Sequence, residues 1–199
     1  MIATPAGRKA GIVAAGQKAG IVAAALLWTG LTTSCASSLP AHNAADATFL
    51  QDMLPHHQQA IAVAQIAARA GVDPRTRTFG GRVIAEQTPE VRRIQDMAKA
   101  LRLHIDLAAG AAMAVHRISP AELSALDQQH GLALDRRFLA LSITSEQGAV
   151  AMARTELAHG RYAPARALAT SIAGAPGGEI PQLQALLSAL AGGVAAAAN

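Results

Sequence analysis

The sequence predicts an all-α protein, a four-helix bundle made from two copies of one helical hairpin. Aromatic residues make up only 3% of the chain, Ala and Leu are abundant, and the β-branched runs typical of strands are missing. Residues 46–101 recur as 135–190, without a gap and at a constant offset of 89. Neither hairpin can bury its own apolar stripe, so we expect the two to pack on each other.

Capping residues and helical spacing place the elements in order. The first helix is expected between the N-cap Asp46 and Gly71, which suits the position after a helix end. The second begins near Pro74, a residue favoured at the first helical position, and completes a first hairpin at 46–102. A crossover is expected at 103–134, with a short helix opened by the capping box Ser119–Glu122. The second hairpin follows at 135–190, with helices from about 134 to 160 and from 162 to 190. Residues 191–199 are expected to form a flexible tail.

Residues 1–34 are typical of an export signal. Basic residues at 8, 9 and 18 precede an apolar run at 19–31, which is too short for a membrane span of ~20 residues. Cys35 follows in a context similar to a bacterial lipobox, and a single cysteine cannot form an internal disulfide. We therefore expect a protein in the cell envelope, outside the cytoplasm, held at the membrane by a lipid on Cys35, or secreted if Cys35 is removed.

Charge and motifs exclude several classes of function. The chain has 17 basic and 13 acidic residues; without the signal the balance is 14 − 13 = +1, so we expect no nucleic-acid partner. No phosphate-binding loop, His-Glu-x-x-His motif or serine nucleophile elbow is present, so we expect no enzymatic activity. A homo-oligomer is compatible with this composition, and the sequence does not identify a protein partner.

The polar residues that interrupt the apolar stripes point to one central site. His56 lies about 16 residues before the first turn and Glu90 about 17 after it, so both stand at one height in the hairpin. Glu146 and Glu179 repeat this arrangement in the second hairpin. Glu90 and Glu179 also fall on or beside the apolar stripes, where an ionised carboxylate needs a cation or an imidazolium nearby. His56 and the adjacent His57 could meet that need.

Two interpretations of this layer stay open. In the first, His56, His57 and Glu90 bind a transition-metal ion, with Met53, Gln87, Glu146 or Glu179 beside them; such donors favour copper over zinc or iron. In the second, the same residues form a hydrogen-bonded core network in a structural or protein-interaction module. Glu86 is expected to be a surface charge.

One family resemblance bears on this choice. The segment Phe49-x3-Met53-x-Pro55-His56-His57, followed by Ile84-x2-Gln87-x2-Glu90, resembles the exported bacterial domain of unknown function 305, a ferritin-like helical family. The resemblance implies an envelope protein with a suspected role in holding transition metal, copper for some relatives. The implied signature residues are Met53, His56, His57, Gln87 and Glu90. The second copy has neither histidine and carries Pro176 in place of the glutamine, which implies a single asymmetric site.

Overall fold

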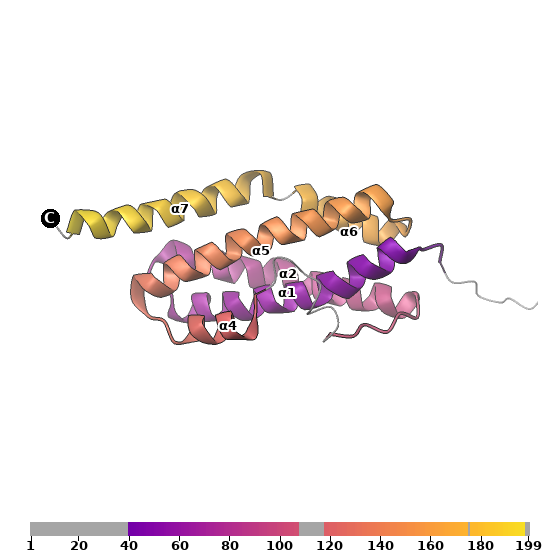
Figure 1. The fold of residues 1–199 in the computed structure, drawn as a ribbon, viewed down its shortest axis with the longest axis horizontal. Coiled ribbons are helices and arrows are strands. Elements are labelled where there is room, and N and C mark those ends of the chain that lie inside the picture. The colour runs from indigo at the N-terminus through magenta and orange to yellow at the C-terminus, as the bar shows by residue number, and fades with distance from the viewer. Residues whose placement is uncertain (1–39, 108–117, 175, 198–199) are drawn as a thin grey trace, which may run out of the picture. The chain divides into compact units, whose positions relative to one another are not determined.

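The computed structural model of the chain describes residues 40–107, 118–174 and 176–197. Within these ranges it contains helices and no strand, which confirms the predicted all-α bundle (Figure 1). The predicted signal at 1–34 and Cys35 lie outside the described residues. The helices are α1 (Ala44–Ala70), α2 (Pro74–Ala100), α4 (Pro120–Asp127), α5 (Gly131–His159), α6 (Ala163–Gly174) and α7 (Pro176–Ala197).

The first hairpin consists of α1 and α2, and the start of α1 differs from the prediction. The N-cap is Asn43, whose side-chain oxygen accepts hydrogen bonds from the backbone N–H groups of Ala45 and Asp46. Asp46 returns the contact by accepting the Asn43 N–H at 2.6 Å, which completes a capping box. Asp46 was therefore wrongly predicted as the N-cap, since it occupies the third helical position. α2 begins at Pro74 as expected, and its N-cap Asp73 accepts the N–H of Arg75 at 2.7 Å.

In the second hairpin, two consecutive helices take the place of the single second helix that we expected. We expected one helix from residue 162 to about 190, but α6 ends at Gly174 and α7 begins at Pro176 and extends to Ala197. Proline has no backbone N–H and clashes with the preceding turn, so it favours the start of a new helix over the interior of an old one. The matching residue of the first hairpin is Gln87, and α2 is continuous there. In the crossover, Ser119 and Glu122 form the predicted capping box of α4.

Two equivalent aspartates join the hairpins in a reciprocal way. Asp46 at the start of α1 accepts the N–H groups of Arg161 and Tyr162 in the turn of the second hairpin, both at 2.8 Å. Asp135, its counterpart in α5, accepts the N–H groups of Val72 and Asp73 in the turn of the first, at 3.1 and 2.7 Å. The start of the first helix of each hairpin thus lies against the turn of the other hairpin. This is expected for two copies related by an approximate two-fold rotation.

A polar layer divides the core at the middle of the bundle. One apolar cluster contains the second half of α1 and the first half of α5, including Val63 and Phe138. The other contains the first half of α1 and most of α6, including Leu50 and Leu168. Between the two clusters lie buried polar side chains, namely His56, His57, Gln87, Ser142 and Ser145. None of the helices in the described ranges is both long enough and apolar enough to cross a membrane.

Two neighbouring glycines of α2 give a matched test of this packing. A Cβ on Gly80 would lie 2.8 Å from the Ala64 carbonyl oxygen of α1, whereas a Cβ on Gly81 would meet nothing within 4 Å. We expect Gly80→Ala to lower the free energy of unfolding by about 1–3 kcal/mol because the helices must separate. Gly81→Ala should raise it by about 0.5–1 kcal/mol through helix propensity. Chemical denaturation of both variants measures the difference, and equal shifts would contradict the close approach of α1 and α2.

Candidate metal centre

The two adjacent histidines of α1 are both buried, at 2% exposure, but they turn to different partners. The Nε2 atom of His57 lies 2.8 Å from Oε2 of Glu90 in α2, whereas the matching heights had been predicted for His56 and Glu90. A carboxylate oxygen accepts, so Nε2–H donates. The Nδ1 atom of His57 is buried and has no hydrogen-bond partner within the described residues. His57 therefore makes one hydrogen bond through Nε2, while its second ring nitrogen, Nδ1, makes none to the described residues.

His56 faces α5 instead. Its Nε2 lies 3.1 Å from the backbone oxygen of Ser145 and 3.3 Å from the Ser145 hydroxyl. Ser145 is the residue that matches His56 in the repeat, as their separation of 89 shows. A residue that touches its own counterpart lies on the axis relating the two copies, so His56 is a central contact between the hairpins. The His56 and His57 ring centroids are 6.0 Å apart.

A pocket of about 340 Å³ opens beside His57 and collects carboxylates from both hairpins. Glu86 and Glu90 come from α2, Glu146 from α5 and Glu179 from α7. The repeat relates Glu90 to Glu179 and His57 to Glu146, so the pocket contains the His57–Glu90 pair and its counterpart in the second hairpin. Gln87, Ala149, Ser171 and Ile172 complete the lining.

The carboxylates in this pocket repel one another, which makes their ionisation less favourable. Burial raises the pKa of Glu146 to about 7, and the negative charges of Glu179, Glu86 and Glu90 add to the effect. Burial and the charge of Glu179 also raise the pKa of Glu86. An additional cation in the pocket would relieve this repulsion and keep the carboxylates ionised.

One built-in cation already stands at the edge of the pocket. The guanidinium of Arg82 lies 3.4 Å from Oε1 of Glu179, and its charge opposes the raised pKa values of Glu86 and Glu146. Arg82 also sits over the ring of Phe79, with Cζ 5.0 Å from the ring centroid. Half-exposed as it is, Arg82 offsets part of the negative charge and leaves the pocket acidic.

The structure brings together five of the seven residues that the sequence suggested for a metal site: His57, Gln87, Glu90, Glu146 and Glu179. Met53 packs in an apolar cluster and His56 bonds to Ser145, and neither lines the pocket. Glu86, expected to be a surface charge, is exposed but lines the pocket mouth. Its spacing of four residues from Glu90 could have shown this, because such residues share one helix face. In the described part of the chain, no three His, Cys, Asp or Glu side chains are already arranged to hold a metal ion.

A second buried acid lies away from this pocket and was not predicted. Glu156 of α5 is 1% exposed, and burial raises its pKa to about 7, with the neighbouring Asp46 carboxyl as the second cause. Burial also opposes ionisation of Asp46, but hydrogen bonds from Tyr162, Asn43 and Arg161 outweigh it and lower the pKa of Asp46. The pair therefore takes up a proton, on Glu156, as the pH falls through about 7. The first hairpin has Ala67 at the position of Glu156, so only one end of the bundle carries this pair.

This arrangement predicts a pH dependence of stability. The pKa of Glu156 in the folded chain lies above its ordinary value of 4.5, so the folded chain keeps a proton that the unfolded chain releases. The stabilisation is complete below pH 4.5 and is lost as the pH rises through about 7. We expect Glu156→Gln to be more stable than the wild type at pH 8 by about 1–2 kcal/mol and similar to it at pH 4.5. Thermal unfolding at both pH values measures this, and an equal gain at both would show that Glu156 is already ionised.

Comparisons with known proteins agree with the helical architecture. A family model described as a domain of unknown function, DUF305, matches residues 46–187, which span both hairpins. No curated protein matches the chain. The match begins at Asp46 and contains every residue that lines the central pocket.

Several solved structures share the fold. A Streptomyces coelicolor protein named as a secreted DUF305 protein is 22% identical, with a TM-score of 0.68 over 74% of this chain and 94% of that one. A DUF305 fragment from Deinococcus radiodurans is 26% identical, with a TM-score of 0.67 over 75% of this chain and 99% of that one. CopM in its Cu(II)-bound form is 23% identical, with a TM-score of 0.62 over 72% of this chain and 95% of that one. CopM is also known in Cu(I)-bound and silver-bound forms.

Proposed function

The chain belongs to the DUF305 family, and from this premise we propose that it binds a transition-metal ion in the pocket beside His57. The observation that carries the proposal is the convergence of one imidazole and four carboxylates from both hairpins on one pocket. We further propose that this binding, and not catalysis, is the function of the protein. The copper-bound and silver-bound forms of CopM support the proposal, since they have the same fold.

Two features of the pocket fit a metal ion. The buried Nδ1 of His57 has no hydrogen-bond partner in the described structure, and a buried polar atom without a partner is costly. Burial and acidic neighbours raise the pKa of Glu146, so a bound cation would stabilise its ionised form. His57 would supply nitrogen, and Glu146 and Glu179 oxygen. Glu90 would fix the imidazole orientation, as carboxylates do for many metal-binding histidines.

The site must close when it binds. No metal-ready group of three side chains exists in the described residues, so the carboxylates that line the pocket must move together when the ion binds. The ion would supply Lewis acidity and charge that draw the carboxylates together. Arg82 would then no longer be required as the partner of Glu179.

The donor chemistry favours one group of ions. An imidazole with carboxylates suits divalent ions, and among these the Irving–Williams order places copper above zinc and iron. Met53 is the soft thioether that Cu(I) and silver would prefer, but it packs in the apolar cluster outside the pocket. We therefore propose Cu(II) as the favoured ion.

The cellular place of this activity is also part of the proposal. The predicted signal and Cys35 support a lipid-anchored protein of the cell envelope, and the name of the Streptomyces relative as a secreted protein agrees with export. Labelling of expressing cells with a palmitate analogue tests the anchor. The wild type should incorporate the label and Cys35→Ser should not, while label in both or in neither would contradict lipidation at Cys35.

Calorimetric titration of the purified protein with Cu(II), Zn(II) and Ag(I) tests the function. We expect one Cu(II) per chain, weaker Zn(II) and the weakest Ag(I). The Glu146→Gln/Glu179→Gln double variant should weaken Cu(II) binding roughly 10- to 100-fold. Asp96→Asn removes an exposed carboxylate outside the pocket and should bind like the wild type. Absence of Cu(II) binding, or equal loss in both variants, would favour the structural or interaction module instead.

A further inference from the structure

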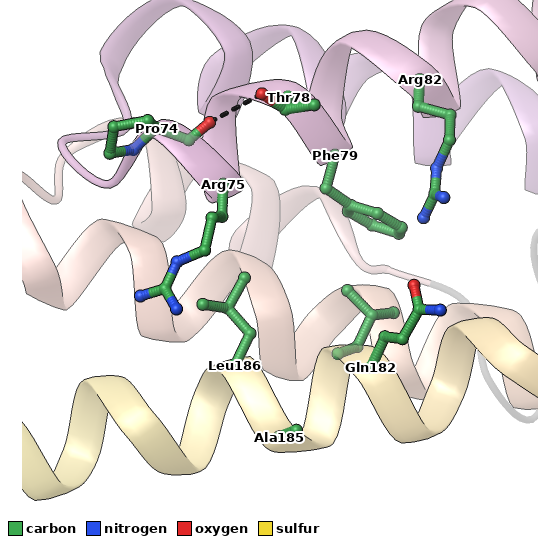
Figure 2. Close-up of a pocket in the computed structure, with 9 residues that line it drawn as sticks. Pro74, Arg75, Thr78, Phe79, Arg82, Gln182, Ala185 and Leu186 are labelled. Atoms are coloured by element: carbon green, nitrogen blue, oxygen red, sulfur yellow. Dashed lines mark hydrogen bonds between the residues drawn. The ribbon is translucent and has the colours of Figure 1, made fainter.

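A second and larger cavity lies along the same face of α2, nearer the start of that helix. It is a groove of about 570 Å³ between α2 and α7, shown in Figure 2. It forms because α2 packs on α1 whereas α7 packs on α5, which leaves these two helices apart along one edge. Its lining consists of Pro74, Arg75, Thr78, Phe79 and Arg82 from α2 with Gln182, Leu183, Ala185 and Leu186 from α7.

The middle of the groove is apolar and well ordered by packing. Phe79 is 7% exposed and contacts the ring of Phe138 at 5.9 Å between centroids, so it forms a fixed floor. Leu183 is 2% exposed and belongs to the same apolar cluster as Phe79. Leu186 extends this surface toward Arg75, as Figure 2 shows. The floor can therefore accept a hydrocarbon chain without rearrangement of the core.

Polar groups mark one end of the groove. Figure 2 shows the side chains of Arg82 and Gln182 facing each other across it. The Arg82 pair with Glu179 is loose at 3.4 Å, compared with about 2.7–2.9 Å for a strong charge-assisted hydrogen bond. A guanidinium has five N–H donors, so Arg82 retains donors for a second anion. The Gln182 amide can add an N–H from the opposite wall.

The charged side chains that line the groove are all positive. The charged residues that line the groove are Arg75 and Arg82, and none of the lining residues is acidic. Arg75 is held by Asp73 through two hydrogen bonds of 3.0 and 2.8 Å, which leaves Arg82 as the more available cation. An anionic headgroup near Arg82 with an apolar tail toward Leu186 matches both halves of this surface.

We propose that this groove binds a single-chain fatty acid. Its carboxylate pairs with Arg82 and Gln182, replacing the loose contact of Arg82 with Glu179, and its chain lies over Phe79 toward Leu186. The cavity volume falls within the range of about 300–1,000 Å³ that is usual for small-molecule pockets. Arg82 and its partner Glu179 connect the groove with the acidic pocket, but none of the residues that line the groove is a proposed metal ligand, so this inference does not depend on the metal site.

Binding of the fluorescent fatty acid 11-(dansylamino)undecanoic acid to the purified protein, in the presence of a metal chelator, tests the proposal. Emission should rise on binding, and laurate should displace the probe whereas methyl laurate, which has no charge, should not. Arg82→Gln should weaken binding roughly 10- to 100-fold, and Arg82→Lys should restore part of it. Ala185→Trp should fill the groove and abolish binding, because Ala185 is exposed and lines it.

Ala189→Trp is the matched control, since Ala189 is an exposed residue one turn further along α7 and does not line the groove. It should bind the probe like the wild type. Circular dichroism should show that every variant is folded. The proposal is overturned if the probe does not bind, if Ala185→Trp and Arg82→Gln bind as the wild type does, or if methyl laurate competes as well as laurate.

Discussion

Replacing His57 by alanine is expected to abolish Cu(II) binding, with affinity falling about 100-fold or more, while His56→Ala leaves it nearly unchanged. The reason is the direction of each ring. His57 lines the acidic pocket and contacts Glu90, whereas His56 is bonded to Ser145 at the contact between the hairpins. Loss of a metal ligand costs at least as much as the 10- to 100-fold that loss of a supporting residue costs. Calorimetric titration of the two variants measures the contrast.

Folding must be separated from binding in this test, because both rings are buried. His57→Gln keeps a polar side chain of similar length and should also lose binding while remaining folded. His56→Ala should lower the free energy of unfolding by about 2–4 kcal/mol, since it leaves a cavity in the core and removes the contact with Ser145. If His56→Ala removed Cu(II) binding and His57→Gln kept it, the assignment of the ligand would be reversed.

The largest expected effect on stability comes from Asp46→Ala. The Asp46 carboxylate is fully buried and accepts three backbone N–H groups, from Asn43, Arg161 and Tyr162. Its removal leaves those donors without a partner and detaches the turn of the second hairpin from the start of α1. At about 1–3 kcal/mol for each unsatisfied group, we expect a loss of roughly 3–5 kcal/mol. Urea denaturation at pH 7 measures it.

Two other aspartates serve as comparisons. Asp135→Ala removes the counterpart contact, which has two N–H donors, Val72 and Asp73, and should cost less than Asp46→Ala. Asp96→Ala removes an exposed carboxylate and should change stability by less than about 0.5 kcal/mol. A loss for Asp46→Ala no larger than that for Asp96→Ala would contradict the role of Asp46 as a link between the hairpins.

The fold was predictable to the extent that local residues decide it. The repeat, the glycines at the turns and the capping box at Ser119 and Glu122 predicted both hairpins and the short helix. The role of Asp46 was not predictable, because its partners Arg161 and Tyr162 lie 115 and 116 residues away. The break before Pro176 carried a visible signal, but the strong apolar repeat after it favoured one continuous helix.

The sequence predicted the level of the candidate site in the bundle, but not the direction in which each side chain points. Equal distances from the turns placed Glu90, Glu146 and Glu179 in one layer, and the structure places them around one pocket. Which histidine faces that pocket depends on α5, because the Ser145 backbone attracts His56. Adjacent residues on a helix point ~100° apart, so spacing alone could not separate the two rings. The ion pair of Arg82 with Glu179 could not be predicted either, because the two residues belong to different hairpins.

Duplication gives this site its asymmetry. The copy that retains His57 and Gln87 faces a copy with Glu146 and Pro176 at the matching positions. One hairpin therefore offers nitrogen and the other adds carboxylate, and α7, which begins at Pro176, also forms one wall of the groove beside Arg82. The proposed site therefore predicts a single metal ion per chain.

Anomalous diffraction at the copper edge, from crystals of the purified protein grown with Cu(II), tests the metal site most directly. We predict one peak in the central pocket, about 2.0–2.2 Å from a nitrogen of His57 and from carboxylate oxygens of both hairpins. The account is contradicted if that pocket shows no peak at full Cu(II) loading, or if copper is held only by exposed side chains while His57 keeps its contact with Glu90.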